Sequence, residues 1–147
     1  MKTKFDKIQD SGEKQKFETG AVRDLQEGKG RFDLIPPIVL ERLAKHYELG
    51  SLKYNESNFR LGIPIKRYID SALRHINKYR MGLEDEDHLI AAIWNLAGII
   101  ETEYLIELGY LTDYLDNGKF YSKKVFDQIK KYQEEYLKNK KIKEQIK

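Results

Sequence analysis

The side chains best suited to chemistry are concentrated between positions 66 and 103 of this sequence. A run of four acidic residues, 84–87, is followed at once by His88, and His75 precedes it. Carboxylates and imidazoles bind divalent cations, and a bound cation would relieve the mutual repulsion of adjacent carboxylates. Acidic residues also offset the positive end of a helix, so a capping role is the alternative. We therefore expect a metal or phosphate site at this point of the chain.

The absence of cysteine narrows the chemistry of that site. With no cysteine in 147 residues, disulfides, thiolate zinc sites and cysteine nucleophiles are all excluded. A metal must then be held by carboxylates, imidazoles or amides. Such ligands suit Mg²⁺ or Mn²⁺ better than structural zinc.

Two helices, 66–80 and about 86–109, are predicted to position these groups. On the first, Asp70 and Arg74 are four residues apart and share one side. The second is expected to bury one apolar stripe of five residues, Leu89, Ala92, Ile93, Leu96 and Ile100. A neighbouring stripe of Ala91, Asn95 and Gly98 is small or polar. We expect it to leave a slot in which polar groups face a ligand.

Segments before this pair contain further candidate ligands. Residues 1–33 are predicted to form an extended arm, in which Lys29 and Arg31 flank a glycine. Backbone at glycine can approach a ligand closely, and flanking cations suit phosphates, although a plain polar loop fits equally well. A helix is predicted to start within 34–37 at its prolines and to end near Gly50, or to continue past it.

The end of that helix and the loop 55–64 combine polar and aromatic groups. Glu48 precedes Lys53 and Tyr54, and the loop contains Asn58 followed by Phe59. An amide beside an aromatic ring can bind the edge of a nucleobase and stack on its face. The alternative is a turn residue and a hydrophobic plug.

No segment shows convincing strand alternation and no internal repeat is visible, so the chain is predicted to be all-α, a bundle of four to five helices. Its length fits one domain. We divide it into the N-terminal arm 1–33, a helical catalytic core 34–115, and a C-terminal basic amphipathic helix 116–147 that packs on the core or on a partner subunit.

The composition of the chain limits which partners it is expected to bind and in which cell compartment we expect it. No apolar run approaches the ~18 residues of a membrane span, and the first residues lack the apolar core of a signal peptide. We therefore expect a cytoplasmic protein without a membrane partner. From 119 to 147 there are ten lysines and four acidic residues. A basic segment can bind nucleic acid, but it is more often a solvated helix face, and nucleic acid is not the partner we expect.

Six motifs together resemble a known family. They are TGAVRD at 19–24, GKGRFDLIPP at 28–37, LGSLKY at 49–54, the Asn58-Phe59 pair, RYIDSALRH at 67–75 and DEDHLIAAIWN at 85–95. From about residue 11 to 103 the chain resembles the phage-associated dATP/dGTP diphosphohydrolases, which group with the all-α, MazG-like nucleoside triphosphate pyrophosphohydrolases. The family's usual tryptophan after the loop asparagine is Phe59 here, which keeps the aromatic ring.

The resemblance implies hydrolysis of a purine deoxynucleoside triphosphate to its monophosphate and pyrophosphate. MazG-like proteins hold Mg²⁺ or Mn²⁺ on ExxE and ExxD motifs of two facing helices. Residues 84–87 can supply ExxD, but the preceding helix has Asp70, Ser71 and Arg74 in place of ExxE. The resemblance also implies a homo-oligomer, a dimer or higher, and the host cytoplasm if the chain is phage-encoded.

Roles follow for the candidate residues. Predicted metal ligands are Glu84, Asp87 and Asp70, with Glu48 as a substitute. Predicted catalytic residues are Asp87, with His88 and His75 as ligand or water-orienting base. Predicted phosphate contacts are Lys53, Arg74, and Lys29 or Arg31. Asn58 or Asn95 would bind the base or sugar, and Tyr54 or Phe59 would stack on the base.

Two other functions fit parts of the sequence. An HD-type phosphohydrolase is suggested by the adjacent Asp87 and His88, although their order is the reverse of His-Asp. A non-catalytic helical interaction module, or a nucleic-acid-binding one, would use the basic last helix, and the acidic run would then only cap a helix.

Overall fold

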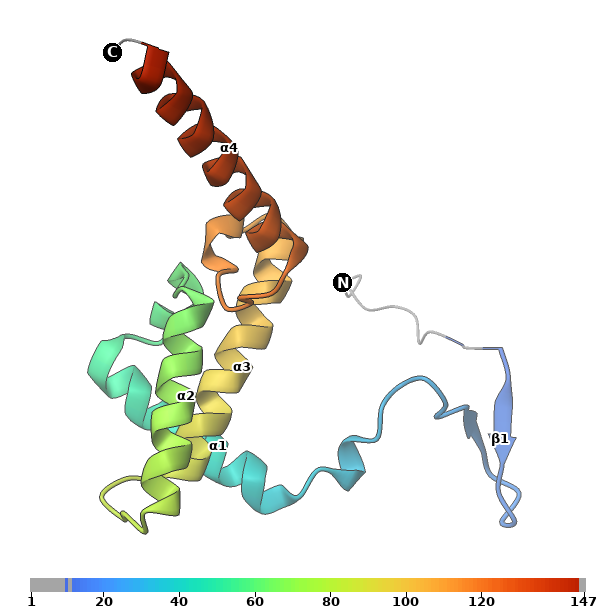
Figure 1. Cartoon of the computed structure of the whole chain (residues 1–147). Coiled ribbons are helices and arrows are strands. Elements are labelled where there is room, and N and C mark those ends of the chain that lie inside the picture. The colour runs from blue at the N-terminus through green and yellow to red at the C-terminus, as the bar shows by residue number, and fades with distance from the viewer. Residues whose placement is uncertain (1–9, 11, 146–147) are drawn as a thin grey trace, which may run out of the picture. The chain divides into compact units, whose positions relative to one another are not determined.

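The structure is a computed structural model that describes residue 10 and residues 12–145, the last two by backbone only. The chain divides into two compact units, the first ending at Pro37 and the second beginning at Ile38. The first unit contains a small two-stranded sheet, and the second contains the helices (Figure 1).

A β-hairpin occupies part of the first unit. Strands β1 (Lys14–Lys16) and β2 (Val22–Asp24) pair antiparallel, with Gln15 opposite Arg23. Gly20, at φ +87°, adopts the left-handed conformation that the connecting turn requires. The expectation of no strand was therefore wrong here. Each strand has only three residues and is charged along much of its length, so there is no apolar alternation to detect.

The second unit is all-α, as predicted. Its helices are α1 (Pro37–Tyr54), α2 (Ile65–Arg80), α3 (His88–Glu107) and α4 (Lys123–Gln145). Short 3₁₀ turns, η2 (Asn58–Leu61) and η3 (Asp113–Leu115), connect them, and η1 (Phe32–Leu34) precedes them in the first unit. α1 runs through Gly50, and Asn55, at φ +101°, follows its last turn.

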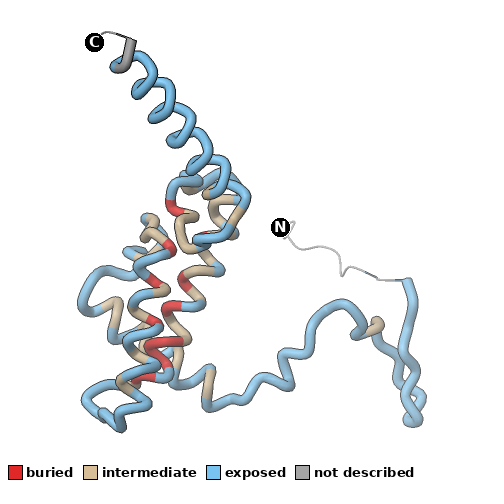
Figure 2. Tube along the Cα trace, viewed as in Figure 1, coloured by how far each residue is buried: buried red, intermediate tan, exposed pale blue. Residues whose placement is uncertain are grey.

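The core lies between α2 and α3. Figure 2 shows the buried residues gathered along the line where these helices face each other. They are Ile65, Tyr68 and Ala72 of α2, and His88, Ile90, Ala91, Ala92, Asn95, Gly98 and Thr102 of α3. The helices are in tight contact at Gly98, where an added Cβ would lie 2.5 Å from the Tyr68 ring. The missing side chain therefore sets the spacing of the pair.

This packing corrects the predicted core face of α3, of which Ala92 is buried and Ile93 partly buried. Leu89, Leu96 and Ile100 were expected to be buried and are exposed. The stripe predicted to form a slot faces α2 instead, because its small residues let the helices approach and the Tyr68 ring occupy the space at Gly98. The large residues of α3 therefore form an exposed stripe.

α3 is also the one described helix that is long and apolar enough to cross a membrane. Its mean hydropathy over an 18-residue window is 1.4, which contradicts the expectation that no run is apolar enough. Asn95 and Thr102 lie on its buried side, each donating to a backbone carbonyl one turn earlier at 2.7 Å. Length and hydropathy of this kind are equally typical of the core helix of a helical pair.

The segment after α3 returns to the start of α2. The Asn117 side-chain oxygen accepts a hydrogen bond from the Lys66 backbone N–H at 3.0 Å, and Gly118 lies directly against Ile65. Lys124, near the start of α4, contacts the Asp113 carboxylate at 3.1 Å. The described side chains of α4 are exposed apart from Val125, which is partly buried.

Two glycine substitutions test the α2–α3 packing. Gly98→Ala should lower the free energy of unfolding by about 1–3 kcal/mol, because the new methyl group overlaps the Tyr68 ring. Gly50→Ala, in helical backbone with open space around it, should instead raise it by about 0.5–1 kcal/mol. Chemical denaturation measures both. Equal effects of the two substitutions would contradict the described contact.

Candidate functional site

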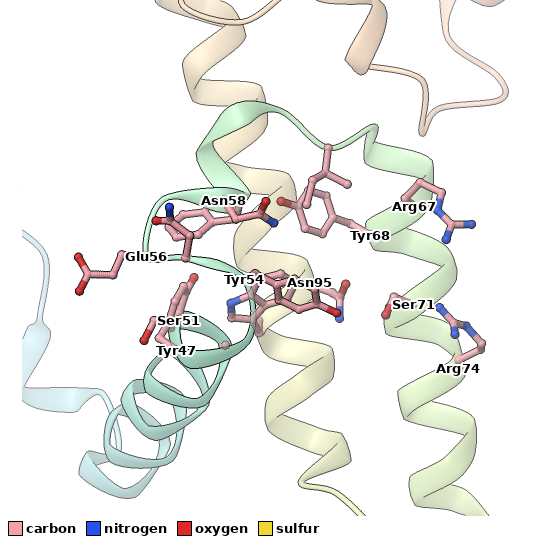
Figure 3. Close-up of a pocket in the computed structure, with 15 residues that line it drawn as sticks. Tyr47, Ser51, Tyr54, Glu56, Asn58, Arg67, Tyr68, Ser71, Arg74 and Asn95 are labelled. Carbon is pink, nitrogen blue, oxygen red and sulfur yellow. The ribbon is translucent and has the colours of Figure 1, made fainter.

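A cavity of about 390 Å³ opens between α1, η2, α2 and α3. This volume lies in the range of ~300–1,000 Å³ typical of small-molecule sites. Figure 3 shows Glu56 and Asn58 on the α1–η2 side, with Arg67, Ser71 and Arg74 on the α2 side. The other lining residues are Tyr47, Gly50, Ser51, Tyr54, Asn55, Phe59, Ile63, Tyr68, Trp94 and Asn95.

Aromatic rings form a continuous cluster on one side of this cavity. The Tyr47 ring lies 5.6 Å from Phe59, edge to face, and 6.1 Å from Trp94. Trp94 in turn lies 5.9 Å from the Tyr68 ring. These centroid distances are those at which aromatic pairs attract each other, so the rings hold one another in place. The cluster offers planar apolar surface to a flat ligand.

Two buried polar groups face the same space. The Tyr68 hydroxyl is buried and has no hydrogen-bond partner of good geometry among the described residues. The Thr102 hydroxyl lies beside it and itself donates to the Gly98 carbonyl at 2.7 Å. Burial raises the pKa of Tyr68, so this hydroxyl stays protonated. An unpaired buried hydroxyl costs about 1–3 kcal/mol, which a ligand acceptor would recover. Asn95, also buried and lining the cavity, uses its amide nitrogen on the Ala91 carbonyl at 2.7 Å.

Arginines of α2 add positive charge to the cavity. Arg67 and Arg74 line it and are exposed. Arg74 contacts Asp70 at 3.2 Å through one nitrogen, an exposed pair of the kind that contributes little and exchanges easily. A guanidinium binds phosphate oxygens through two parallel hydrogen bonds. The α2 side of the cavity therefore suits an anionic group.

A histidine–carboxylate cluster lies beyond one end of the cavity. Ser71 lines the cavity, and His75 lies one turn further along α2. The Nδ1 atoms of His75 and His88 are 3.2 Å apart, and His88 Nε2 lies 3.0 Å from Asp85 Oδ1. Glu86 Oε2 lies 3.9 Å from His75 Nδ1. His75, His88 and Glu86 each offer a ligand atom within 4.8 Å of the others.

Burial and charge set the protonation of this cluster. Burial lowers the pKa of His75, so its imidazole is neutral at pH 7. A hydrogen bond from His88 lowers the pKa of Asp85, which stays a carboxylate. The turn 84–87 thus supplies a carboxylate to each histidine, Asp85 to His88 and Glu86 to His75.

Asp87 has a structural role that competes with metal binding. Its carboxylate caps α3 by accepting from the Ile90 N–H at 3.2 Å, and Arg42 of α1 contacts both its oxygens at 2.6 and 2.8 Å. The hydrogen bonds from Arg42 hold the pKa of Asp87 below its ordinary value. Sequence reasoning missed Arg42, because a contact across 45 residues has no local signal.

The other predicted residues are dispersed. Asp70 is paired with Arg74, and Glu48 with Lys45 at 2.9 Å, each on an exposed helix surface. Glu84 is exposed. The four carboxylates predicted to bind metal are therefore not gathered at one point. By contrast, Tyr54, Asn58, Phe59, Arg74 and Asn95 all line the cavity.

The predicted cations before α2 lie outside the cavity lining. Lys29 and Arg31 belong to the first unit, where Arg31 binds the Asp33 carboxylate at 2.6 and 2.8 Å. Lys53 lies over the Tyr54 ring, 4.9 Å from its centroid. Arg67, Tyr68 and Trp94 were not predicted to contact a ligand. Trp94 is the single tryptophan of the chain, and this was the only feature of the sequence that could have marked it as a site residue.

The fold and the site define an all-α protein with an aromatic, cationic cavity beside a histidine–carboxylate cluster. The family model described as "dATP/dGTP diphosphohydrolase, N-terminal" matches residues 19–107. This matched range covers more than half of the chain and includes helices α1 to α3. The chain therefore belongs to that family. No curated protein and no solved structure matches it.

Two substitutions of Asp87 separate its capping role from its charge. Asp87→Ala should lower the free energy of unfolding by about 1 kcal/mol, because the N-cap acceptor is lost. Asp87→Asn keeps an acceptor, so it should retain most of that stability. Chemical denaturation at pH 7 measures the difference.

The pH dependence of these variants has a defined sign. The folded-state pKa of Asp87 is lowered, so its charge stabilises the protein above the ordinary value of about 3.9. That contribution is lost as the pH falls through the lowered pKa. The difference in free energy of unfolding between the wild type and Asp87→Asn should therefore become smaller below about pH 4. A gap that widened on acidification would contradict the Arg42–Asp87 pairing.

Proposed function

We propose that this protein hydrolyses purine deoxynucleoside triphosphates, dATP or dGTP, to the monophosphate and pyrophosphate with a divalent cation, in the cytoplasm of the cell or of the host if it is phage-encoded. The observation that carries the proposal is the cavity, which combines aromatic rings, amides and arginines one helical turn from the histidine–carboxylate cluster. A nucleotide presents the matching groups, which are a planar base, a polar sugar and a polyphosphate.

The base is proposed to lie in the aromatic part of the cavity. Tyr54 or Phe59 would stack on it, while Asn58 or Asn95 would bind its edge or the sugar. The unpaired Tyr68 hydroxyl would donate to an acceptor of the bound nucleotide, which recovers the cost of its burial. Each of these groups lines the same cavity.

The phosphates are proposed to extend along α2 toward the cluster. Arg67 and Arg74 would bind the phosphate oxygens, and Arg74 would exchange its exposed pairing with Asp70 for a phosphate. His75 is neutral at pH 7, so its one lone pair would bind either the cation described below or the attacking water. Lys53, and Lys29 or Arg31 of the first unit, remain candidate phosphate contacts.

The cation, Mg²⁺ or Mn²⁺ in the family expectation, is proposed to bind at the cluster. His75, His88 and Glu86 fit this role, since each offers a ligand atom to the same point. Asp87, Asp70 and Glu48 are each paired with a cationic side chain, so they would have to release it first. A bound divalent cation supplies positive charge to phosphate oxygens and lowers the pKa of water.

Nucleotide turnover tests the proposal. With Mg²⁺ or Mn²⁺, the purified protein should release pyrophosphate and the monophosphate from dATP or dGTP. Arg67→Met and Arg74→Met should each lower kcat/KM about 10- to 100-fold, because a hydrogen bond to a charged group contributes about 1.5–3 kcal/mol. Arg80→Met, on the same helix but outside the cavity lining, is the matched control.

Product analysis distinguishes the alternatives. Inorganic phosphate or tripolyphosphate in place of pyrophosphate would indicate an HD-type reaction. No turnover of any nucleotide, with salt-sensitive nucleic-acid binding, would indicate a non-catalytic module. Arg67→Met and Arg74→Met activities equal to that of Arg80→Met would contradict the assigned phosphate contacts.

We also propose that the chain acts as a homo-oligomer. Leu89, Ile93, Leu96 and Ile100 follow helical spacing on α3, and three of the four are exposed. Only seven apolar residues of the described chain are buried. Apolar surface of this kind gains roughly 25 cal/mol per Å² when a partner covers it, and a second copy carries the same stripe.

Sedimentation velocity tests the oligomer. The wild-type protein should sediment as a dimer or higher, and Leu96→Glu should shift it toward the monomer by placing a charge in the stripe. Leu52→Glu, at a leucine of α1 that is more exposed than Leu96, should leave the distribution unchanged. A wild-type protein that is monomeric at all concentrations would contradict the proposal.

A further inference from the structure

We infer that His75, His88 and Glu86 form a site for one transition-metal ion, such as Zn²⁺, Co²⁺ or Mn²⁺, in preference to Mg²⁺. The inference deepens the metal dependence proposed above, and its test is metal binding itself. It replaces a site of carboxylates alone with one in which two imidazoles determine the choice of metal.

The two imidazoles already have the separation that a shared ion requires. Their Nδ1 atoms are 3.2 Å apart. Nitrogens bound to Zn²⁺ at about 2.0–2.1 Å, at a tetrahedral angle, lie about 3.3 Å from each other. The separation of the two nitrogens is therefore already that of two ligands of one ion.

Asp85 fixes the tautomer of His88 that a metal ligand needs. His88 Nε2 lies 3.0 Å from the Asp85 carboxylate, which can only accept, so this nitrogen carries the proton. The lone pair of His88 is then on Nδ1, the atom that faces His75. A carboxylate bound to the far nitrogen of a metal-ligating histidine is a recurrent arrangement in metal sites.

Burial holds this orientation. The His88 side chain is 1% exposed, so its ring is fixed by packing as well as by Asp85. Lys78, the cation nearest to Asp85, lies 3.5 Å from the other carboxylate oxygen and leaves the His88 contact intact. His75, from the facing helix, is half-buried beside it. Two helices thus present one ligand each to the same point.

Glu86 completes a three-ligand set from the solvent side. Its Oε2 lies 3.9 Å from His75 Nδ1, and its partly exposed side chain is free to adjust to an ion. Three protein ligands with an open position are typical of catalytic rather than structural sites. Mg²⁺ demands near-octahedral oxygen ligation, whereas imidazole suits later divalent metals.

The alternative is a hydrogen bond between two neutral imidazoles. In that case His75 Nδ1–H donates to His88 Nδ1, and a metal ion would have to displace that proton. The two arrangements share the same distance between the Nδ1 atoms, and metal titration distinguishes them because only one of them binds an ion.

Cobalt titration of the full-length protein, untagged and chelator-treated, is the decisive test. We expect one Co²⁺ per chain, with visible absorption bands that Zn²⁺ abolishes and excess Mg²⁺ does not. His75→Gln and Glu86→Gln should each weaken Co²⁺ binding at least tenfold, and Asp85→Asn should weaken it about 10- to 100-fold. His46→Gln, a histidine beside Trp94 and outside the cluster, should leave binding unchanged.

The metal-binding test can fail or succeed independently of the nucleotide-hydrolysis test. These variants leave the buried His88 in place, and their circular dichroism and thermal unfolding without metal should match the wild type. No Co²⁺ binding, equal competition by Mg²⁺, or His75→Gln binding as tightly as His46→Gln would overturn the inference. Co²⁺ binding without nucleotide turnover would support the metal site and contradict the proposed function. Mg²⁺-supported turnover without Co²⁺ binding would support the proposed function and contradict the metal site.

Discussion

The contact between Gly98 and the Tyr68 ring is the constraint on which the rest of the second unit depends. Because Gly98 has no side chain, α2 and α3 approach closely enough for the ring to lie against its backbone. Toward the acidic turn, the same approach brings His75 within hydrogen-bonding distance of His88. Beside it, the Tyr68 ring meets Trp94 and closes one side of the cavity. The cluster and the cavity are thus two consequences of one helix–helix spacing.

Charge pairing then separates groups that look alike in the sequence. Of the carboxylates in 84–87, Asp87 is committed to Arg42 and to the end of α3, whereas Asp85 and Glu86 face the two histidines. A carboxylate already bound by a guanidinium gains less from a metal ion, because the ion must compete with the existing pair. Position within one turn therefore assigns the capping role to Asp87 and places Asp85 and Glu86 beside the histidines, where we propose the metal site.

The sequence predicted the helices and much of the cavity lining, but not the buried face. Helical periodicity and the prolines before α1 locate the elements, and Asp87 is recognisable as a cap. Periodicity identifies the most apolar stripe of α3, and in this fold its leucines and Ile100 are exposed. Small residues packed against Tyr68 determine the contact instead. The link from Arg42 to Asp87 and the short, charged hairpin strands also have no periodic signal.

The central claim is that a nucleotide and a metal ion meet where α2 and α3 face each other. Anomalous diffraction from crystals grown with Mn²⁺ and a non-hydrolysable dGTP analogue tests it most directly. The account predicts an anomalous peak about 2.0–2.3 Å from Nδ1 of both His75 and His88, with the base beside the Tyr47, Phe59 and Trp94 rings. A peak at Asp70 or Glu48, with no density beside the histidines, would contradict it.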